Sequence, residues 1–487
     1  MENLKQKRNK IHHHFKTCKH QSFAELQNIP TYSRKFIFIP EYCHKTTIAM
    51  QTNKLLLWSF TVALSGFLFG LDVAVISGAE QKIQELWQLS DAMHGLAIAT
   101  ALYGTVIGAL FGGMIADKFG RKRSLFWIGL LFLVSSLGSA MAQDVYVFML
   151  FRVLGGFSIG ASSVVSPLYI SEIAPPKKRG FLVALFQFNI VFGILVAYVS
   201  NYLLGATGEN DWRWMLGIVA IPSLIFTILT LLISESPRWL VLHKSDHAAA
   251  KDVLNQIDPT TAQQTLQAII ESKHSERKTK INFFSKQFRW PILLAFLLAF
   301  FNQASGINAI IYYAPRVFEM TGLGTSAALL SSTGIGLVNL IFTMIGLSLI
   351  DRFGRKLLMY IGSIGYIISL GLMAYAFYTD QYTGMQFFVF MFIAAHAVGQ
   401  GAVIWVFISE IFPNEVRATG QSFGSLTHWV FAAIIANAFP WFASKYGGTP
   451  IFLFFCIMMM LQLLYVRFLM PETKGVALED METRIIH

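Results

Sequence analysis

A short charged segment interrupts this otherwise apolar chain twice, and its repetition limits the folds that the chain can adopt. Residues 117–122 read Asp-Lys-Phe-Gly-Arg-Lys and residues 351–356 read Asp-Arg-Phe-Gly-Arg-Lys, at an offset of 351 − 117 = 234 residues. The tripeptide Ser-Glu-Ile at 171–173 recurs at 409–411, at the similar offset of 409 − 171 = 238 residues. Two halves with matching charged turns are typical of a membrane protein that arose by internal duplication.

The composition also indicates a membrane protein. The chain is 54% hydrophobic and only 13% charged, whereas soluble domains carry about 25% charged residues. A helix needs about 20 mostly apolar residues to cross the ~30 Å hydrocarbon core of a bilayer. Twelve stretches meet this requirement and predict an all-α protein with twelve spans: residues 55–78, 93–116, 124–143, 145–171, 181–204, 213–233, 290–313, 325–350, 357–378, 385–411, 419–443 and 449–470.

Lys and Arg gather in alternate connections between the predicted spans. Positive charge near span ends stays on the cytoplasmic side, so these connections, and with them both termini, are predicted to be cytoplasmic in a multi-pass protein of the cell membrane. Arg213 is the exception, because it lies at an external span end. The basic connections are residues 117–123, 177–179, 234–289 and 351–356, together with Arg417.

The predicted spans also define domains. Residues 50–233 and 290–470 each hold six spans, and residues 234–289 form a cytoplasmic linker with a pattern of two or three short amphipathic helices. Residues 471–487 are a cytoplasmic tail. Residues 1–49 are a basic extension, which is either the result of a start codon assigned too early, since Met50 precedes the first span, or a regulatory arm.

Other classes of function lack their usual signatures. The net charge of +11 is dispersed among loops, which fits membrane topology and not a nucleic-acid surface. Cys18, Cys43 and Cys456 are isolated, and the histidines at 12–14, 20 and 44 lack companion ligands, so neither a disulfide nor a metal site is predicted. Because the sequence contains no phosphate loop, cofactor motif or nucleophile–base pair, we expect no cofactor, no ATP-driven transport and no enzyme.

Two ionisable residues lie inside predicted spans. Asp72 stands about midway along the first span, and Arg152 near the start of the fourth. Such residues are costly in lipid and usually face a cavity. Burial and a neighbouring cation act in opposite directions on the protonation of a carboxylate, so a small rearrangement can switch it. The pair is therefore either a proton-coupling site or a static ion pair between the two helices.

A set of amides and tryptophans is suited to a neutral ligand rich in hydroxyl groups. An amide donates and accepts hydrogen bonds at once, as sugar hydroxyls require, and an indole ring offers an apolar face to a pyranose. Any single amide could instead form a helix–helix hydrogen bond. The set consists of Gln187, Asn302, Gln303, Asn308, Asn339, Trp405 and Trp429, whereas Gln421 lies too near a span end to join one midplane cavity.

From about residue 55 to 482 the chain resembles the sugar porter family of the major facilitator superfamily. The resemblance rests on the two charged segments and on five further motifs. It implies the major facilitator fold, with two six-helix bundles, and points towards bacterial proton-coupled xylose and glucose symporters. The further motifs are Arg-Val-Leu-Gly-Gly at 152–156, Pro-Leu-Tyr-Ile-Ser-Glu at 167–172, Glu-Ser-Pro-Arg-Trp at 235–239, Gln303 with Gly-Ile-Asn at 306–308 and Tyr-Tyr at 312–313, and Pro-Glu-Thr-Lys-Gly at 471–475.

The resemblance implies roles for individual residues. Gln187, Gln303, Asn308, Asn339 and Trp405 match positions that hold the sugar. Tyr312 and Tyr313 match aromatic residues of an extracellular gate. Asp72 matches the proton-coupling carboxylate of symporters, where passive carriers usually have a neutral residue. A cytoplasmic salt-bridge network that latches the outward-facing state is matched by Asp117, Arg121, Glu172, Arg179, Glu235, Arg238, Asp351, Arg355, Glu410 and Arg417.

Some positions depart from the family pattern. Asn302 stands where Gln is common, and His428 replaces a frequent Asn or Gln, which adds a titratable group near the cavity. Residues 399–402 lack the usual proline, so a hinge there would depend on glycine. Leu71 and Ser234 also replace the usual Tyr and Pro.

These features predict a transporter that imports a monosaccharide, either a hexose such as glucose or a pentose such as xylose, together with a proton. The mechanism would be alternating access, and by analogy with the family a monomer is sufficient. The alternatives are a facilitative sugar uniporter, an exporter of drugs or cations with the same fold, and a sugar sensor that does not transport.

Overall fold

The computed structural model describes residues 38–205, 208–275, 282–413 and 416–475. Side chains are described from Lys54 onward, except at 176–177 and 272–275. Residues from Lys54 form one compact unit, and all that follows concerns that unit. The predictions for residues 1–37 and 476–487, including those for Cys18 and the histidines at 12–14 and 20, lie outside the described residues, as do the side chains of Cys43 and His44.

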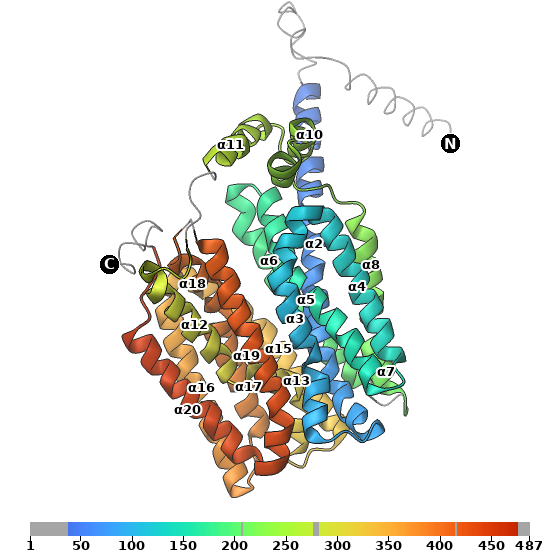
Figure 1. Cartoon of the computed structure of the whole chain (residues 1–487), viewed down its shortest axis with the longest axis vertical. Helices are drawn as coiled ribbons and strands as arrows, with labels where there is room; N and C mark the ends of the chain where they lie inside the picture. Colours follow the sequence, from blue (N-terminus) through green and yellow to red (C-terminus); the bar gives the residue numbers. More distant parts are fainter. Residues whose placement is uncertain (1–37, 206–207, 276–281, 414–415, 476–487) are drawn as a thin grey trace, which may run out of the picture. The chain divides into compact units, whose positions relative to one another are not determined.

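Twelve helical segments of the described chain are long and apolar enough to cross a membrane, which confirms the predicted number. Several consist of two helices in sequence (Figure 1). In the first half they are α2 (Phe38–Leu86, of which Lys54–Leu86 is the span), α3 (Asp91–Phe119), α4 (Arg121–Met141), α5 (Val145–Ile173), α6 (Pro176–Leu204), and α7 (Asp211–Gly217) with α8 (Ala220–Thr230). In the second half they are α12 (Arg289–Ala304) with α13 (Ile307–Tyr312), α15 (Thr325–Phe353), α16 (Arg355–Thr379), α17 (Met385–His396) with α18 (Ala402–Ile411), α19 (Arg417–Tyr446) and α20 (Gly448–Phe468).

The helices pack as two bundles, one from each half. In the first, α4 lies against α5 and α8, and α3 lies against α5. In the second, α16 lies against α17 and α20, and α12 lies against α19. The bundles meet where α19 packs on α3 and α15 packs on α6 (Figure 1). This is the arrangement that duplication of a six-helix unit predicts.

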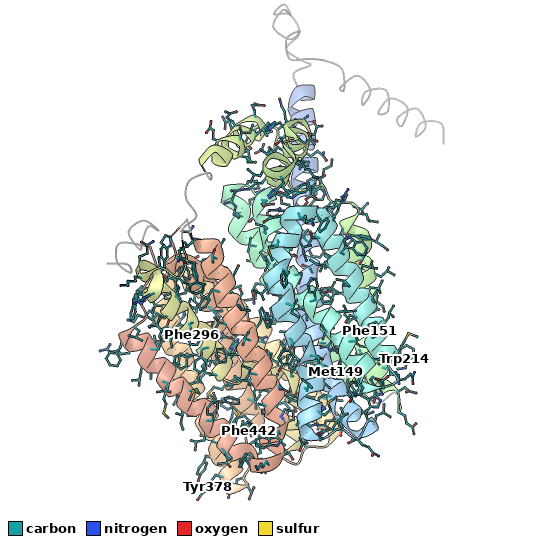
Figure 2. The ribbon with its side chains drawn as sticks, viewed as in Figure 1. Met149, Phe151, Trp214, Phe296, Tyr378 and Phe442 are labelled. Atoms are coloured by element: carbon teal, nitrogen blue, oxygen red, sulfur yellow. The ribbon has the colours of Figure 1, made fainter. Side chains whose placement is uncertain are left out.

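The surface of the bundles carries large apolar side chains, as a surface in contact with lipid requires (Figure 2). Trp214, Tyr378 and Phe442 are exposed near the ends of their helices, at the opposite end of the bundles from residues 117–122 and 351–356. Aromatic residues gather at this depth in membrane proteins because their rings suit the boundary between hydrocarbon and headgroups.

The first span differs from the prediction at its far end. It was predicted to stop at residue 78, but α2 continues to Leu86. The additional turns contain Glu80, which is fully buried. A buried carboxylate is stable only where it is paired, and Glu80 has two such partners, described below.

Two helices in the second bundle are interrupted. Between α12 and α13 the chain turns at Gly306, whose φ of +85° is in the left-handed region. Between α17 and α18 lies a π-helical turn, Ala397–Gly401. This turn includes residues 399–401 of the segment 399–402, where the sequence predicted a glycine-dependent hinge. Such π-helical turns inside α-helices are frequent at functional sites.

The linker contains the short helices that the amphipathic pattern predicts. After α9 (Pro237–Trp239) come α10 (His247–Ile257) and α11 (Ala262–Ser275). The buried side chains of Val241, Ala250 and Leu254 form a small apolar core with Ala262 and Leu266. Lys54, at the start of the first span, donates a hydrogen bond to Gln256 of α10 over 3.3 Å.

Candidate functional site

The first bundle contains a buried ion pair between α2 and α5. Arg152 Nη1 on α5 donates a hydrogen bond to Asp72 Oδ1 on α2 over 2.9 Å. Asp72 is 3% exposed and Arg152 is 1% exposed. The structure thus brings together the two intramembrane charges that the sequence singled out, from helices 80 residues apart in the chain.

The pairing uses little of the hydrogen-bonding capacity of the two groups. Among the described residues, Asp72 Oδ2 and both Arg152 Nε and Nη2 are buried without a partner. A buried ion pair offsets its desolvation only when its remaining donors and acceptors are also satisfied. Unsatisfied buried groups of this kind are rare in folded proteins and often mark functional sites. The pair is therefore poorly stabilised in this conformation.

The second bundle contains a chain of amides around the break between α12 and α13. Asn308 Nδ2 donates to Gln303 Oε1 over 2.8 Å, and Gln303 Nε2 donates to Asn302 Oδ1 over 3.0 Å. Gln303 Nε2 also lies 3.1–3.2 Å from the ring nitrogens of His428 on α19. All three amide residues are buried. Three of the predicted ligand-binding amides thus form one hydrogen-bonded group.

Aromatic rings enclose this group. The His428 ring lies with its centroid 5.1 Å from that of Trp405 on α18 and 4.8 Å from that of Trp429. Trp429 in turn contacts Phe69 of α2 at 5.7 Å. Phe69 precedes Asp72 by three residues, so one turn of helix separates the aromatic contact from the ion pair.

The remaining amides are not joined to this chain by a hydrogen bond within the described residues. Asn339 on α15 is buried, and its Oδ1 accepts a hydrogen bond from Thr343 in the same helix over 3.3 Å. Gln187 on α6 is half-buried. Gln421 lies in the first turns of α19, and its Oε1 is buried without a partner.

The two tyrosines predicted for a gate are fully buried at the end of α13. Tyr313 donates a hydrogen bond to the Ala436 carbonyl over 3.0 Å and stacks on Phe439 at 5.1 Å, both on α19. The hydroxyl of Tyr312 has no partner among the described residues. Its ring lies within electrostatic range of both Asp72 and Arg152. Tyr312 therefore faces the ion pair of the other bundle, while Tyr313 anchors α13 to α19.

A second buried ion pair, not predicted from the sequence, joins the two bundles. Arg316 on α14 (Ala314–Glu319) donates two hydrogen bonds to the carboxylate of Glu80 on α2, over 2.9 and 2.7 Å, and one to Gln84 over 2.6 Å. His94 Nε2 on α3 lies 2.6 Å from the same carboxylate. Burial lowers the pKa of Arg316, but the charge of Glu80 and its hydrogen bonds outweigh this effect, so the pKa lies above its ordinary value.

Further contacts close the bundles together on this side. Gln81 donates to Glu319 over 2.5 Å, and Tyr198 on α6 donates to the Ile311 carbonyl over 2.8 Å. A Cβ atom at Gly95 would lie only 2.0 Å from the Asn437 carbonyl oxygen, so α3 and α19 nearly touch there. These contacts all lie at the end of the bundles opposite the two charged segments.

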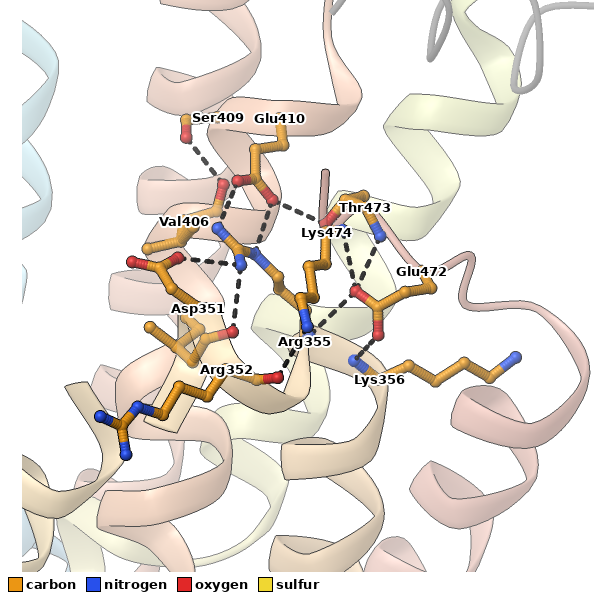
Figure 3. A network of polar contacts seen from close by, with 11 residues as sticks. Asp351, Arg352, Arg355, Lys356, Val406, Ser409, Glu410, Glu472, Thr473 and Lys474 are labelled. Atoms are coloured by element: carbon orange, nitrogen blue, oxygen red, sulfur yellow. Dashed lines mark hydrogen bonds and ion pairs between the residues drawn. The ribbon is translucent and has the colours of Figure 1, made fainter. Parts of the chain in front are cut away.

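At the other end, the charged segments hold each bundle together internally. Arg121 donates two hydrogen bonds to Glu172 on α5, over 3.0 and 2.9 Å, and pairs with Asp117 at 2.9 Å. Arg355 repeats this arrangement with Glu410 on α18, over 3.0 and 2.7 Å, and with Asp351 at 3.2 Å (Figure 3). Six of the ten residues predicted for the network thus form two equivalent clusters.

A carboxylate from beyond the last helix of each bundle completes each cluster. Glu235 accepts backbone N–H groups of Arg121 over 2.8 Å, of Lys122 over 3.2 Å and of Ser236 over 2.9 Å. Glu472 is its counterpart and accepts the backbone N–H groups of Arg355, Lys356, Thr473 and Lys474 over 2.9–3.0 Å (Figure 3). Each carboxylate therefore caps the N-terminus of the helix that follows the charged segment.

The glycine in each charged segment makes room for this carboxylate. Gly120 and Gly354 have φ values of +95° and +87°, which side chains disfavour. A Cβ atom would lie 2.3 Å from the Glu235 carboxylate at Gly120 and 2.6 Å from the Glu472 carboxylate at Gly354. Glycine therefore suits this position of each charged segment, because a side chain there would occupy the space of the capping carboxylate.

The pKa values of the two capping carboxylates are shifted in opposite directions. Burial raises the pKa of Glu235 above its ordinary value, although the backbone donors and Arg121 act in the opposite direction. Burial also opposes ionisation of Glu472, but its four backbone donors prevail, and its pKa is lowered. The additional donor is the N–H group of Lys474.

The remaining three members of the predicted network are Arg179, Arg238 and Arg417. Arg179 is exposed at the start of α6, and Arg238 is exposed in α9. Arg417 donates from Nε to the Phe412 carbonyl over 3.3 Å, and its Nη2 is buried without a partner among the described residues. The ion pairs of Arg121 and Arg355 each stay within one bundle.

Sequence reasoning missed two groups of site residues. Glu472 carried a detectable signal, because it follows Glu235 by 472 − 235 = 237 residues, close to the offset of the other repeated motifs. Glu80, His94 and Arg316 carried none, because the group is not repeated in the other half and its members come from three distant segments.

Comparisons with known proteins agree with this architecture. A family model described as "Sugar (and other) transporter" matches residues 58–484. The chain belongs to the sugar transporter family. Among curated members, it is 36% identical to the arabinose-proton symporter of Bacillus subtilis over 88% of this chain and 94% of that protein. It is 34% identical to the D-xylose-proton symporter of Escherichia coli over 89% of this chain and 96% of that protein.

This sugar transporter also matches solved structures. The xylose transporter XylE from E. coli, in a partially occluded inward open conformation, superposes with a TM-score of 0.79 at 32% identity, over 87% of this chain and 100% of that one. The match confirms the predicted major facilitator fold. Membership of the family also identifies the chain as a multi-pass membrane transporter and not an enzyme.

Proposed function

We propose that this protein imports a monosaccharide together with a proton, by alternating access between its two bundles. The observation that carries the proposal is the incompletely paired Asp72–Arg152 ion pair, which lies in one bundle within electrostatic range of Tyr312 of the other. Relatives at about this similarity are named as proton symporters for arabinose and xylose. Their names support the same class of substrate here.

The ion pair supplies the proton site. Protonation of Asp72 removes one of two opposite charges and weakens its hydrogen bond to Arg152. The freed guanidinium must then find other partners, which favours a different arrangement of α2 and α5. In this way the protonation state of one carboxylate biases the equilibrium between two conformations of the carrier.

The amide chain supplies the sugar site. The side chains of Asn302, Gln303 and Asn308 present donors and acceptors beside the rings of Trp405 and Trp429. Aldoses such as xylose, arabinose and glucose carry hydroxyl groups on one face and C–H groups on another, and they can satisfy both kinds of surface at once. Asn339 and Gln187 would complete the site from α15 and α6.

The conformation described here is inward-facing in this proposal. Positive charge places the two charged segments in the cytoplasm, with both termini on that side. The bundles are joined at the opposite, external end by the Glu80–Arg316 ion pair and by the hydrogen bond from Tyr198 to the Ile311 carbonyl. The similarity to an inward open conformation of XylE supports the same assignment. One chain contains both sites, so a monomer would suffice.

Transport into proteoliposomes tests the proposal. A membrane potential of about 100 mV supplies about 2.3 kcal/mol per proton, which corresponds to roughly 40-fold accumulation. Radiolabelled xylose, arabinose and glucose should accumulate when an inward proton gradient is imposed, and a protonophore should abolish the accumulation. Equilibration that ignores the gradient would identify a uniporter, and absence of uptake would contradict sugar transport.

A substitution separates coupling from transport. Asp72→Asn should retain exchange of sugar across the membrane but lose uphill accumulation, because the amide cannot bind the coupled proton. Asp144→Asn is the matched control, since Asp144 lies in the same bundle and caps α5, a role that Asn also performs. Unimpaired accumulation by Asp72→Asn would contradict the assignment of the proton site.

A further inference from the structure

The amide chain of the second bundle ends on a histidine, and this affects the orientation of every amide in it. Gln303 Nε2 approaches His428 at 3.1–3.2 Å from its two ring nitrogens. An amide NH2 group can only donate, so the imidazole must accept. It does so only through a nitrogen that carries no proton.

The other hydrogen bonds of Gln303 agree with this orientation. Its Nε2 also donates to Asn302 Oδ1, and its Oε1 accepts from Asn308 Nδ2. If the amide turned over, its oxygen would face the Asn302 oxygen and its nitrogen would face the Asn308 nitrogen. Both contacts would then be repulsive, so neutral His428 and the present arrangement of the three amides belong together.

We propose that His428 is a positioning residue for the sugar site, and that its protonation disorders the amides and weakens sugar binding. The inference rests on the proposed function. Doubly protonated imidazole has N–H groups at both positions and cannot accept from Gln303. Gln303 must then either lose a hydrogen bond or turn over against its two neighbours. Acidification would therefore weaken binding, independently of the coupling carboxylate.

The surroundings of His428 were considered for other titratable groups. On α17, His396 lies within electrostatic range of His428, and its Nδ1 lies 2.5 Å from the Tyr366 hydroxyl of α16. Of the other helices packed against α19, α3 carries Tyr103 within its length. On α18, Glu410 pairs with Arg355. On α20, Cys456 and Tyr465 donate hydrogen bonds to backbone carbonyls. Among the described residues, His396 is the titratable group that lies within electrostatic range of His428.

His428 and His396 have different partners, which makes their roles separable. His428 contacts the amide chain directly, whereas His396 joins a polar cluster behind it. In that cluster Tyr366 donates to Gln400 over 3.1 Å, Gln400 donates to Gln462, and Gln462 donates to Ser363 over 2.8 Å. Removal of His396 should therefore leave the dependence of sugar binding on His428 intact.

Equilibrium binding to the purified full-length protein tests the inference. Asp72→Asn serves as the parent, so that the coupling carboxylate contributes no pH dependence. The dissociation constants of radiolabelled xylose, arabinose and glucose are measured between about pH 8 and about pH 4, a range that extends below ordinary histidine titration because burial disfavours the charged imidazole. In the parent, binding should weaken by roughly three- to tenfold on acidification, the equivalent of one hydrogen bond.

Two substitutions and two controls then identify the titrating group. His428→Gln supplies an acceptor that does not titrate, so the acid weakening should disappear. His428→Leu supplies no acceptor, so binding near pH 8 should already be as weak as that of the acidified parent. His396→Gln and His247→Gln, the latter at an exposed linker histidine, should both retain the parent's pH dependence.

The outcomes distinguish the inference from the function on which it rests. An unchanged pH dependence in His428→Gln, its loss in His396→Gln, or a flat profile in the parent would each overturn the inference while leaving sugar binding established. Absence of binding by any of the three sugars would overturn the proposed function and the inference together.

Discussion

Arg316 and Glu80 form a two-pronged ion pair that crosses from one bundle to the other. The residues are 236 positions apart in the chain, and the carboxylate is fully buried. In the proposed alternating-access cycle, the bundles separate on this side when the carrier faces outward, and the pair would then break. In this proposal the Glu80–Arg316 pair is a latch on the inward-facing state.

Removal of both members of the latch should shift the carrier towards the outward-facing state. The double substitution Glu80→Gln and Arg316→Gln avoids an unpaired buried charge. Hydrogen bonds to charged groups are worth about 1.5–3 kcal/mol, so a shift of roughly tenfold or more is expected. Spin labels at Gln143 and Gln381, one in each bundle at this end, should report a larger separation.

The matched control for this experiment is Lys82→Gln, which breaks an ion pair with Asp211 inside the first bundle. That substitution should leave the distance distribution unchanged. An unchanged distribution in the double variant would show that the latch does not set the conformational balance.

The two capping carboxylates should affect stability with opposite dependence on pH. The pKa of Glu472 is lowered in the folded protein, so its contribution is present at neutral pH and is lost as the pH falls through the folded pKa. The pKa of Glu235 is raised, so its contribution is present in acid and is lost as the pH rises through the folded pKa.

Thermal unfolding of the corresponding glutamine variants measures this difference. Glu472→Gln should lower the unfolding midpoint near neutral pH, and the deficit should shrink in acid. Glu235→Gln should be tolerated better near neutral pH than in acid. If the unfolding midpoints of the two variants changed with pH in the same way, the opposite pKa shifts of Glu472 and Glu235 would be contradicted.

Substitution of Gly354, the glycine of the charged segment 351–356, should destabilise the second bundle. Gly354→Ala combines a backbone conformation that costs about 1–3 kcal/mol for other residues with a contact that displaces Glu472. The unfolding midpoint should fall. Gly180→Ala is the control, because a Cβ atom there meets nothing within 4 Å; an equal effect of both substitutions would contradict the explanation.

Loss of the central amide should weaken sugar binding. Gln303→Leu leaves Asn308 and Asn302 without their partner and removes a group that the sugar would contact. A decrease in affinity of about tenfold or more is expected from one lost hydrogen bond with unpaired neighbours. The measurement is equilibrium binding, with Asn189→Ala as control, since the Asn189 amide bonds within its own helix. Equal affinities of the two variants would exclude Gln303 from the site.

The sequence predicts those parts of the molecule that repetition or composition makes visible. Apolar length predicted the twelve spans, and the resemblance to the sugar porter family implied a salt-bridge network that includes Arg121 and Arg355. Rare charges in apolar helices predicted Asp72 and Arg152. The end of α2 was misjudged because Glu80 counts as polar in the sequence, while burial against Arg316 and His94 makes its turn part of the span.

Features that depend on tertiary geometry could not be predicted. The contact of His428 with Gln303 links residues 125 positions apart, and the sequence indicated only that a titratable group replaces an amide there. The exposure of Arg179 at the start of α6 likewise depends on how the helices pack, which the sequence does not specify.

The capping of each charged segment by a carboxylate from the far end of the same bundle has a consequence for recombination between relatives. Glu235 belongs with residues 120–122, and Glu472 with residues 354–356, because each carboxylate packs against the glycine of its segment and accepts the backbone N–H groups that follow it. A chimaera joined in the linker between the bundles keeps both pairs native. A crossover inside a bundle combines a turn from one parent with a carboxylate from the other, and intact bundles are therefore the natural units of exchange in this family.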